Sequence, residues 1–416
     1  MPKLSPVPRA DLAKAAEKLA TPFYYYDARV IRSRYTALRD ALPGGWRLFY
    51  AAKANPNIAV LEIYRKMGAA VECASAGEML ACSKAGYKGG DMVLSGPVKG
   101  ERELSSIRKN PPAMIHAETV GELAALDKLG KRLNVALRLN LDLHISRKSA
   151  GRVMTGGKDK FGFSPEDAEI VLKGRGKYKN LSFCGFHMYM GTQMRKASIW
   201  LKGAHTFALF AAEIAKRHGL EPSYLNFGGG LGIPYSDGES EFDLREFKKG
   251  LAVLHRRLSG IREFGNTIFH IEPGRYLMGP AGYYVMKIVS LKKMRGTNFA
   301  LTDGGVHHAL LPFRVSREFP AVAVSGKGGK MEPYILGGPL CTTLDQSDLP
   351  LQLPRLSEGD IIAIHNSGAY GYGTGMHFFL SHPLPAEALY DGGSLRLIRE
   401  PSTFAHLFRY QVDRKI

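Results

Sequence analysis

The sequence predicts an α/β protein in which a (β/α)8 TIM barrel is followed by a β-rich C-terminal domain of the barrel or sandwich type. Eight short apolar runs recur between residues 46 and 272, and most are followed by a turn and a helical pattern. From about residue 277 onward, alternating apolar runs are separated by turns rich in Gly, Pro and Asp. The first pattern is typical of βα units, and the second is typical of short strands in a β domain.

The eight predicted barrel strands follow one another along the chain. They lie at residues 46–53, 70–75, 92–96, 113–118, 134–140, 181–191, 224–228 and 267–272. Helical patterns, for example at 58–67, 76–86, 197–219 and 242–264, supply the crossovers. Eight such units fit a closed barrel better than an open doubly wound sheet, which would usually need fewer strands.

Three regions are predicted on this basis. Residues 1–26 contain a helical segment and an aromatic run, and we expect them to pack on the β domain. Residues 27–276 form the barrel, and residues 277–416 form the β domain. Within the β domain, strands are expected at 282–291, 298–302, 360–365 and 394–399.

The net charge is the unusual property of the composition. The 57 Lys and Arg residues outnumber the 38 Asp and Glu residues, which gives a formal charge of +19. The basic residues are scattered and match no nucleic-acid-binding signature, so we expect no nucleic-acid partner and favour an acidic substrate or protein. The sequence shows neither a bilayer-spanning apolar stretch nor a signal-peptide pattern, which predicts a cytoplasmic protein without membrane contact. The four cysteines are irregularly spaced and indicate neither a disulfide framework nor a zinc site.

A lysine at the end of the first apolar run is the candidate nucleophile. Lys53 stands just before the turn at 55–57, and the carboxyl ends of barrel strands are where this fold keeps its chemistry. Taken alone, Lys53 is one basic surface residue among many. Its interpretation depends on the motifs that end the later strands.

Three such motifs end the sixth, seventh and eighth predicted strands. The alternation of the sixth strand aims His187 and Tyr189 to one side. The glycine cluster at 228–232 lets backbone N–H groups approach and cradle a phosphate. Glu272 and Arg275 offer a carboxylate and a guanidinium side by side. A core histidine, a flexible turn and a satisfied ion pair are the structural alternatives, and no single motif decides against them.

Taken in order, these motifs resemble the fold-type III pyridoxal-phosphate decarboxylases, which include the diaminopimelate, ornithine and arginine decarboxylases. The resemblance runs from residues 21–23 to 382–383, and the sequence DKFG at 159–162 is similar to the family's SKFG loop. It implies a pyridoxal phosphate enzyme that removes CO2 from an amino acid without a metal. It also implies a homodimer with shared active sites, to which the β domain contributes.

The resemblance assigns roles to individual residues. Lys53 would carry the cofactor, and Glu272 would pair with the pyridine nitrogen. The cofactor phosphate would be held by Gly229, Gly230, Arg275, Tyr370 and Thr192, the last in place of the family's serine. The ring-stacking histidine of the family falls on Tyr189, which leaves the role of His187 at the cofactor open. Cys341 resembles the cysteine that the neighbouring subunit supplies, and it would protonate the product carbon.

The residues that read the far end of a free diamino acid are missing. Diaminopimelate decarboxylases carry Arg-Pro-x-x-Tyr where this chain has LPFRV at 311–315, and their Cys-Glu-Ser segment reads CTT at 341–343. Buried polar readers are what produce strong substrate discrimination, so their loss predicts a different substrate. The expected substrate contacts are Arg275, Arg314, Thr342, Asp345 and Tyr370.

The motifs at 304–308, 338–342, 366–371 and 379–383 look like a branch of biosynthetic decarboxylases. That branch includes the butirosin glutamyl-acyl-carrier-protein decarboxylase and the staphyloferrin B siderophore decarboxylase. The resemblance implies decarboxylation of an L-amino-acid moiety on a conjugated or carrier-tethered substrate in specialised biosynthesis. A charge of +19 suits an acidic conjugate or an acyl carrier protein, because electrostatic steering acts at range.

Three alternatives stay open. A diaminopimelate decarboxylase with a relaxed site is disfavoured by Leu311, Val315 and Thr342. A catalytically inactive regulatory or binding homologue is disfavoured by the joint presence of Lys53, Glu272 and Cys341. A relative of alanine racemase would need a catalytic tyrosine from the second domain.

Overall fold

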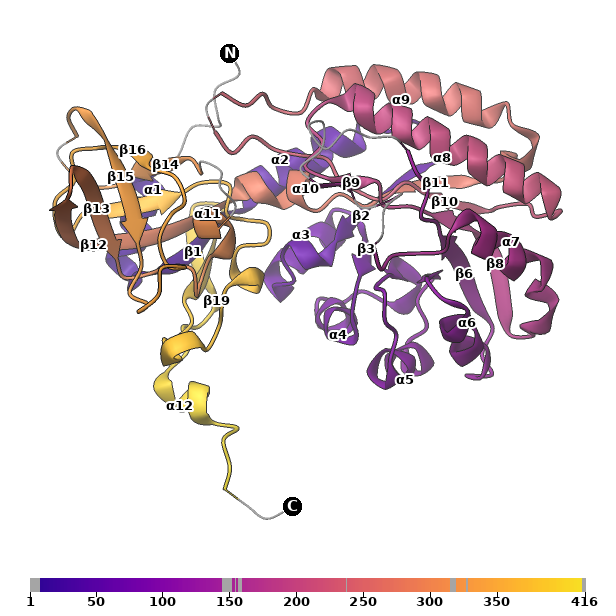
Figure 1. The fold of residues 1–416 in the computed structure, drawn as a ribbon, viewed down its shortest axis with the longest axis horizontal. Coiled ribbons are helices and arrows are strands. Elements are labelled where there is room, and N and C mark those ends of the chain that lie inside the picture. The colour runs from indigo at the N-terminus through magenta and orange to yellow at the C-terminus, as the bar shows by residue number, and fades with distance from the viewer. Residues whose placement is uncertain are drawn as a thin grey trace. The chain divides into compact units, whose positions relative to one another are not determined.

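The chain divides into two compact units. In a computed structural model, which describes residues 8–143, 152–153, 155, 159–236, 238–314, 319–326 and 328–413, one unit comprises Arg32–Ile233 and Glu241–Leu277. The other comprises Met1–Ile31, Pro234–Ser240 and Met278–Ile416. Each unit has its own sheet and its own core (Figure 1).

The first unit is a closed parallel barrel. Its strands are β2 (Trp46–Ala51), β3 (Ala70–Cys73), β4 (Met92–Leu94), β5 (Met114–Ala117), β6 (Leu133–Arg138), β8 (Leu181–His187), β10 (Tyr224–Asn226) and β11 (Ile268–Ile271). They close in the order β10-β11-β2-β3-β4-β5-β6-β8, which confirms the predicted (β/α)8 barrel. All eight predicted runs contribute one barrel strand each.

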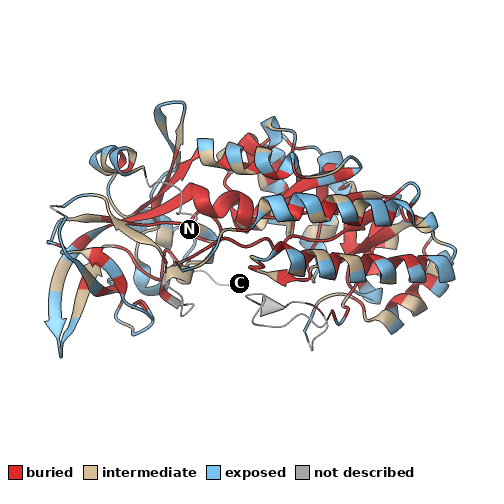
Figure 2. Ribbon diagram, turned by 90° about the horizontal axis from the view of Figure 1, so that it is seen from above, coloured by how far each residue is buried: buried red, intermediate tan, exposed pale blue. Residues whose placement is uncertain are grey.

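Helices surround these strands. They are α2 (Ala28–Arg39), which the unit boundary crosses, α3 (Ile58–Lys66), α4 (Ala76–Lys84), α5 (Glu101–Lys109), α6 (Val120–Asp127), α7 (Pro165–Lys173), α8 (Ala197–Arg217) and α9 (Leu244–Ser259). Several begin at a side chain that accepts a hydrogen bond from a first-turn N–H, as at Asn57, Ser75, Thr119, Ser164 and Asp243. Buried and exposed residues alternate along the long helices in Figure 2, as expected when one face packs on the barrel.

The barrel interior has an apolar layer and a polar layer. Phe49, Val93, Met114, Ala136 and Tyr224 form a buried cluster of barrel-strand residues. Two residues further along β5 and β10, His116 and Asn226 are fully buried as well. Because side chains two apart on a strand share a face, the polar layer lies one step closer to the carboxyl ends.

The second unit is built on a nine-stranded sheet, which confirms the predicted β-rich domain. Its strands are β1 (Phe23–Asp27), β12 (Gly282–Met294), β13 (Thr297–Thr302), β14 (Ala321–Ala323), β15 (Met331–Gly337), β16 (Leu351–Pro354), β17 (Ile361–Ile364), β18 (Ala386–Asp391) and β19 (Ser394–Arg399). The N-terminal strand β1 lies between β12, to which it is antiparallel, and β18, to which it is parallel. Helices α1 (Arg9–Lys18), α11 (Leu310–Arg314) and α12 (Phe404–Phe408) complete the unit.

The core of this unit joins the two ends of the chain. Leu12 and Ala15 of α1 cluster with Phe23 and Tyr25 of β1 and with residues of the C-terminal strands, among them Tyr283, Val285, Ala363 and Ala386. Among the described residues, no helix has both the length and the hydropathy needed to cross a bilayer.

Candidate active site

Lys53 lies on a single-turn helix, η1 (Ala52–Ala54), that directly follows β2. Its ammonium Nζ is 2.9 Å from Oε2 of Glu72 on the neighbouring strand β3, and 5.8 Å from the ring centroid of Tyr189. The lysine side chain is 34% exposed, whereas the Glu72 side chain is fully buried. The predicted nucleophile is thus held at the barrel's carboxyl end by a buried carboxylate that the sequence had not indicated.

Glu72 is a poorly solvated acid. Burial raises its pKa, the Lys53 ammonium opposes that rise, and Glu272 adds to it. Glu78, in the first turn of α4, accepts a hydrogen bond from the Ala74 N–H at 2.7 Å. Burial, followed by repulsion from Glu72, raises the pKa of Glu78 to about 7.

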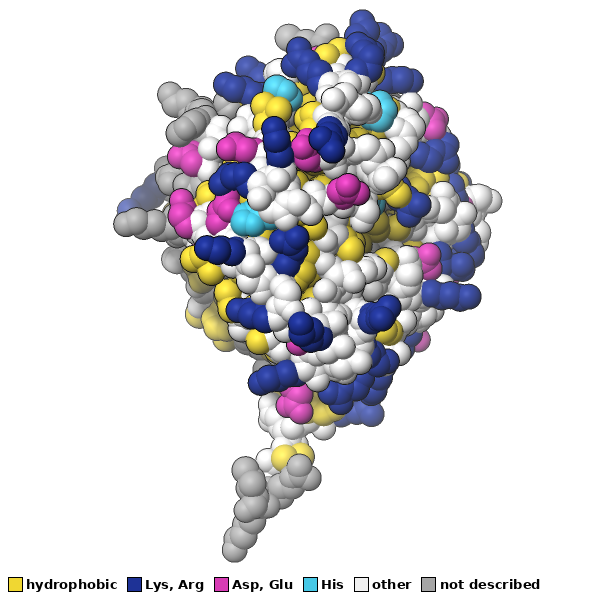
Figure 3. Space-filling model, turned by 90° about the vertical axis from the view of Figure 1, so that its right-hand side faces the viewer, with side chains coloured by type: hydrophobic (Ala, Val, Ile, Leu, Met, Phe, Trp, Pro, Cys, Tyr) yellow, Lys and Arg dark blue, Asp and Glu magenta, His cyan; other side chains and the backbone are white. Residues whose placement is uncertain are grey.

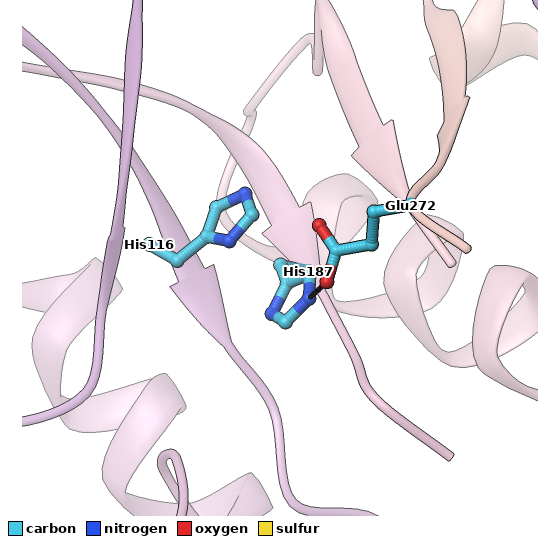
Figure 4. A group of neighbouring side chains, drawn as sticks. All are labelled: His116, His187 and Glu272. Atoms are coloured by element: carbon cyan, nitrogen blue, oxygen red, sulfur yellow. Dashed lines mark hydrogen bonds and ion pairs between the residues drawn. The ribbon is translucent and has the colours of Figure 1, made fainter. Parts of the chain in front are cut away.

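Glu272, just after β11, is the centre of the buried polar layer. Its Oε1 is 3.1 Å from Nε2 of His187, and its Oε2 accepts a hydrogen bond from Nδ2 of Asn226 at 3.1 Å. The rings of His187 and His116 stack with centroids 3.9 Å apart and planes 10° from parallel (Figure 4). His187 therefore lies against a second histidine and the buried acid.

The hydrogen bonds of Asn226 fix the orientation of this network. The Gly228 N–H donates to Oδ1 of Asn226 at 2.8 Å, so Nδ2 must face Glu272 and the Tyr224 hydroxyl, 2.7 Å away. The Tyr224 oxygen thus accepts from Asn226 and donates its own proton to Nε2 of His116 at 2.8 Å. Nδ1 of His116 then carries the proton and donates to the Ser95 hydroxyl at 2.8 Å.

The charges of the network follow from its burial. Burial lowers the pKa of His116 and His187 well below the ordinary value, and the nearby cations Lys99 and Arg138 lower it further. Both rings are therefore neutral, and His187 donates to Glu272 through Nε2. Burial raises the pKa of Glu272, while Lys53 and Arg138 and the Asn226 hydrogen bond oppose the rise.

His116, His187 and Glu272 also bring three metal-type ligand atoms within 4.8 Å of one another. Both ring nitrogens of His116 already make hydrogen bonds, at 2.8 Å each. The two imidazoles are stacked face to face, so their in-plane lone pairs lie in nearly parallel planes and do not converge on one point. The geometry is that of a hydrogen-bonded stack, and the absence of a metal requirement stays a prediction.

The glycine cluster after β10 is packed tightly against the neighbouring strand ends. Gly228 and Gly230 adopt φ values of +66° and +88°, which favour glycine. A Cβ on Gly229 would lie 2.5 Å from the Glu272 carbonyl oxygen, and one on Gly230 would lie 2.3 Å from that of Gly191. The Met194 N–H donates to the Gly230 carbonyl at 2.9 Å, which places the cluster beside the segment that contains Thr192.

The predicted extent of the sixth barrel strand was wrong. The sixth strand was expected to continue through residues 181–191, but β8 ends at His187, and Gly191–Thr192 form a separate strand, β9, antiparallel to β7 (Arg152–Val153). The chain leaves the barrel sheet there because its next backbone partners are the glycine cluster and β7. Tyr189 lies in the intervening turn and is half-buried.

Arg275 begins the short helix α10 (Arg275–Met278) after Glu272. Gly274 leaves room for η1, because a Cβ there would lie 2.8 Å from Cβ of Ala54. The strand ends that carry Lys53, Glu272 and Arg275 are therefore in contact.

The DKFG loop is also tied to the barrel mouth. Oε2 of Glu118 accepts from the Gly162 N–H at 3.1 Å, and Oε1 pairs with Nη1 of Arg138 at 2.8 Å. The Arg138 guanidinium lies 4.3 Å from the ring centroid of Phe161. Arg138, one of the two cations that oppose the rise in the Glu272 pKa, therefore also contacts this loop.

Cys341, Thr342 and Asp345 share one loop of the β unit. Cys341 is exposed, Thr342 is half-buried, and Asp345 is 3% exposed. Oδ1 of Asp345 accepts from the Val306 N–H at 2.6 Å, and Oδ2 accepts from the Leu340 N–H at 2.7 Å. Asp345 therefore joins the loop that contains Cys341 to the loop at 304–308.

The remaining predicted residues of the β unit have different outcomes. Tyr370 is half-buried with a φ of +57°, and Asn366 in the same motif has a φ of +58°. Left-handed non-glycine residues of this kind cluster at functional sites. The side chain of Arg314, and Val315 altogether, lie outside the described residues, so the predicted contact of Arg314 stays a prediction.

Sequence reasoning missed the residues that hold the predicted ones. These are Glu72, Ser95, His116, Tyr224 and Asn226. The signal that could have found two of them is a polar residue inside an apolar strand, as in Met114-Ile115-His116-Ala117 and Tyr224-Leu225-Asn226-Phe227. In a closed barrel such residues face one another across a dry interior.

Comparison with known proteins gives consistent matches over most of the chain. Residues 28–279 match the model of the pyridoxal-dependent decarboxylase family, pyridoxal binding domain. An L-glutamyl-(BtrI acyl-carrier protein) decarboxylase of Niallia circulans is 31% identical over 407 residues, which cover 95% of this chain and 94% of the relative. A diaminopimelate decarboxylase of Aquifex aeolicus is 29% identical, with 97% and 94% covered. The crystal structure of a diaminopimelate decarboxylase from M. jannaschii with L-lysine superposes with a TM-score of 0.89 at 24% identity, over 97% of this chain and 94% of that one.

Proposed function

The chain belongs to the pyridoxal-dependent decarboxylase family and decarboxylates an amino acid; we propose that this amino acid is the free end of a conjugated or carrier-tethered substrate. The observation that carries the proposal is the replacement of the charged readers by Leu311 and Thr342. The 31% identity to a glutamyl-carrier-protein decarboxylase over 95% of this chain supports it.

The residues of the barrel mouth fit pyridoxal phosphate. Bound there, the cofactor supplies an electron-withdrawing pyridinium ring that accepts the electron pair left behind when CO2 departs. Lys53 would hold its aldehyde carbon, and the buried Glu272 carboxylate would hold its ring nitrogen. The phosphate would be held by the Gly229 and Gly230 backbone, Thr192, Arg275 and Tyr370.

The chain's own groups control where protons lie. Glu72, 2.9 Å from the Lys53 amine and with its pKa raised by burial, is placed to accept a proton when that amine must be neutral. Asn226 and His187 each donate one hydrogen bond to Glu272, which orients the carboxylate, and the Asn226 bond opposes the rise in its pKa that burial causes. The buried stack beneath excludes water from this side of the site.

The proposed substrate follows from the absence of charged side chains at positions 311 and 342 of the β unit, where diaminopimelate decarboxylases bind the distal end of their substrate. Leu311 offers only apolar contact, and Thr342 offers one hydroxyl, so a free distal ammonium or carboxylate gains little there. A substrate whose remainder is recognised further out does not need these readers. Lys and Arg side chains spread over the face in Figure 3, with fewer acidic ones, and would steer an acidic carrier or conjugate.

We also propose a homodimer in which Cys341 serves the partner's site as the proton donor to the product carbon. A mixture of Lys53→Ala and Cys341→Ala subunits tests this arrangement. Random reassortment gives one intact site in half of the dimers, so about a quarter of wild-type activity should return. If mixing restores nothing although dimers exchange, each subunit builds its site alone.

The substrate is tested with purified holoenzyme by CO2 release and product mass. The panel contains meso-diaminopimelate, lysine, ornithine, arginine, a glutamyl-acyl carrier protein and a citryl-diaminopropionate conjugate. We expect turnover of a conjugate with the free diamino acids nearly inert. We also expect kcat/KM for the carrier-bound substrate to fall as salt is raised.

Diaminopimelate decarboxylase is the second candidate, favoured by the 29% identity to the Aquifex aeolicus enzyme over 97% of this chain. Efficient turnover of meso-diaminopimelate, with the conjugates inert, would establish it and discard the first proposal.

A further inference from the structure

A cavity of about 930 Å³ lies at the amino-terminal end of the barrel strands. The predicted cofactor site lies at their carboxyl-terminal end. It is lined by the first residues of five parallel strands, Trp46, Ala70, Met114, Tyr224 and Ile268, and by Asp91 just before β4. Since parallel strands start at one end of a barrel, these residues mark its amino-terminal opening. All lining residues belong to the barrel unit.

The void exists because small residues stand where the strands begin. Gly68, Ala70, Gly90 and Ala113 line the cavity and contribute at most a methyl group each. Four members of the apolar cluster that contains Tyr224 line its inner end. A cavity of several hundred Å³ with an apolar floor has the size of a small-molecule site.

The rim of the cavity is cationic and its wall is aromatic. Arg47, Arg65 and Lys88 line it together with a single carboxylate, Asp91, whose oxygen already accepts the Lys88 backbone N–H at 3.0 Å. The positive potential reaches His270, whose pKa is lowered to about 3 by burial and then by Arg47. Tyr87 adds a flat ring to the wall.

We propose that this cavity is a second ligand site, which takes a small anion that carries a flat apolar group. The cations at the rim would bind the anionic group, and the aromatic wall and apolar floor would bind the flat part. The site is separate from the one that holds the cofactor, and its existence does not depend on which amino acid the enzyme decarboxylates.

The floor connects this cavity to the active site. Tyr224 lines the cavity, and its hydroxyl accepts from Nδ2 of Asn226 at 2.7 Å, while the same nitrogen donates to Glu272 at 3.1 Å. Two hydrogen bonds thus separate the cavity floor from the carboxylate that would hold the cofactor ring. A ligand that moves the Tyr224 ring would change the absorbance of the bound cofactor.

The test uses cofactor-saturated enzyme and the fluorescent probe anilinonaphthalene sulfonate, which combines an anion with flat rings. We expect saturable binding with one probe per subunit. Arg47→Glu, at an exposed position, should raise the probe Kd at least about tenfold, and Ala113→Phe should fill the cavity and do the same. Arg245→Glu makes the same charge change on an exposed residue outside the cavity and should leave the Kd within about twofold.

Absence of saturable binding, displacement of the probe by added pyridoxal phosphate, or an unchanged Kd in both cavity variants would each overturn the proposal. Probe binding that persists in Tyr224→Phe, but no longer changes the cofactor absorbance, would assign the coupling to the hydroxyl. Binding that never changes the absorbance in the wild type would overturn the inferred coupling between the cavity and Glu272.

Discussion

The barrel half and the β half of the predicted site are built in different ways. In the barrel, Glu72, His116, His187 and Glu272 are at most 2% exposed and make hydrogen bonds or ion pairs with one another or with neighbouring strands. In the β unit, Cys341 is exposed and Thr342 is half-buried, and Asp345 is the buried residue that anchors their loop.

This difference shows which part of the predicted site can change with little loss of folding stability. Altering one member of a buried polar network leaves its partners unsatisfied, which costs about 1–3 kcal/mol for each group. A substitution at an exposed loop position usually changes the stability by less than about 0.5 kcal/mol. The buried network in the barrel is therefore expected to stay constant while the predicted substrate contacts on loops of the β unit diverge.

The largest effect is expected from Lys53→Ala. Loss of the amine removes the covalent anchor, so kcat should fall at least about 10³-fold. Activity and cofactor absorbance measure this, with Lys66→Ala as the control, since that lysine is 69% exposed on α3. A Lys53→Ala enzyme with more than a tenth of wild-type turnover would contradict the assignment.

The next effect separates the two halves directly. Asn226→Ala removes the donor to both Glu272 and Tyr224, and we expect it to lower the free energy of unfolding by about 2–3 kcal/mol and to reduce kcat as well. Thr342→Ala should leave the unfolding free energy within about 0.5 kcal/mol of the wild type. Urea denaturation of both variants and the wild type measures these unfolding free energies. Equal stability losses would abolish the distinction between a buried half and an exposed half.

Asp345→Asn tests the buried carboxylate that anchors the Cys341 loop of the β half. An amide NH2 cannot accept the hydrogen bond that a carboxylate oxygen accepts, so either the Val306 or the Leu340 N–H loses its partner. We expect kcat/KM to fall about tenfold and stability to fall about 1–2 kcal/mol, with cofactor affinity unchanged. Loss of cofactor binding in this variant would show that the anchor serves the barrel half too.

The smallest effect concerns pH. The pKa of Glu78, about 7, lies above its ordinary value of 4.5, so between these two pH values the folded chain keeps a proton that the unfolded chain has lost. This group therefore lowers the unfolding free energy as pH rises. Glu78→Gln keeps an acceptor for the Ala74 N–H and removes the titration, so the variant should gain up to about 1 kcal/mol over the wild type at pH 8 relative to pH 5. A constant difference across that range would contradict the raised pKa.

Much of the barrel could be predicted because its strands are buried on both faces. Such strands read as continuous apolar runs bounded by turns, and all eight runs were found in the sequence. In the β unit, β14 and β15 are half-exposed along most of their length, so their patterns are weak. β14 and β15 were missed for that reason, and β16 and the mostly buried β18 were missed as well.

The site divides in the same way. Lys53, Glu272 and the glycine cluster stand at strand ends and belong to motifs that resemble a family. His116 and Tyr224 are 108 residues apart in sequence, and only closure of the barrel brings their side chains within 2.8 Å. Local patterns carry no information about such a pairing, so the network that orients Glu272 could not be predicted.

The position of β1 in the second sheet determines when that sheet can form during synthesis. Phe23 leaves the ribosome early, yet its partners are Val285 of β12 and Ala386 of β18. The barrel can close while those strands are still untranslated, but the other sheet cannot be completed until almost the whole chain has emerged. During that interval the tyrosine-rich strand β1 has both edges unpaired, and unpaired strand edges expose a nascent chain to aggregation.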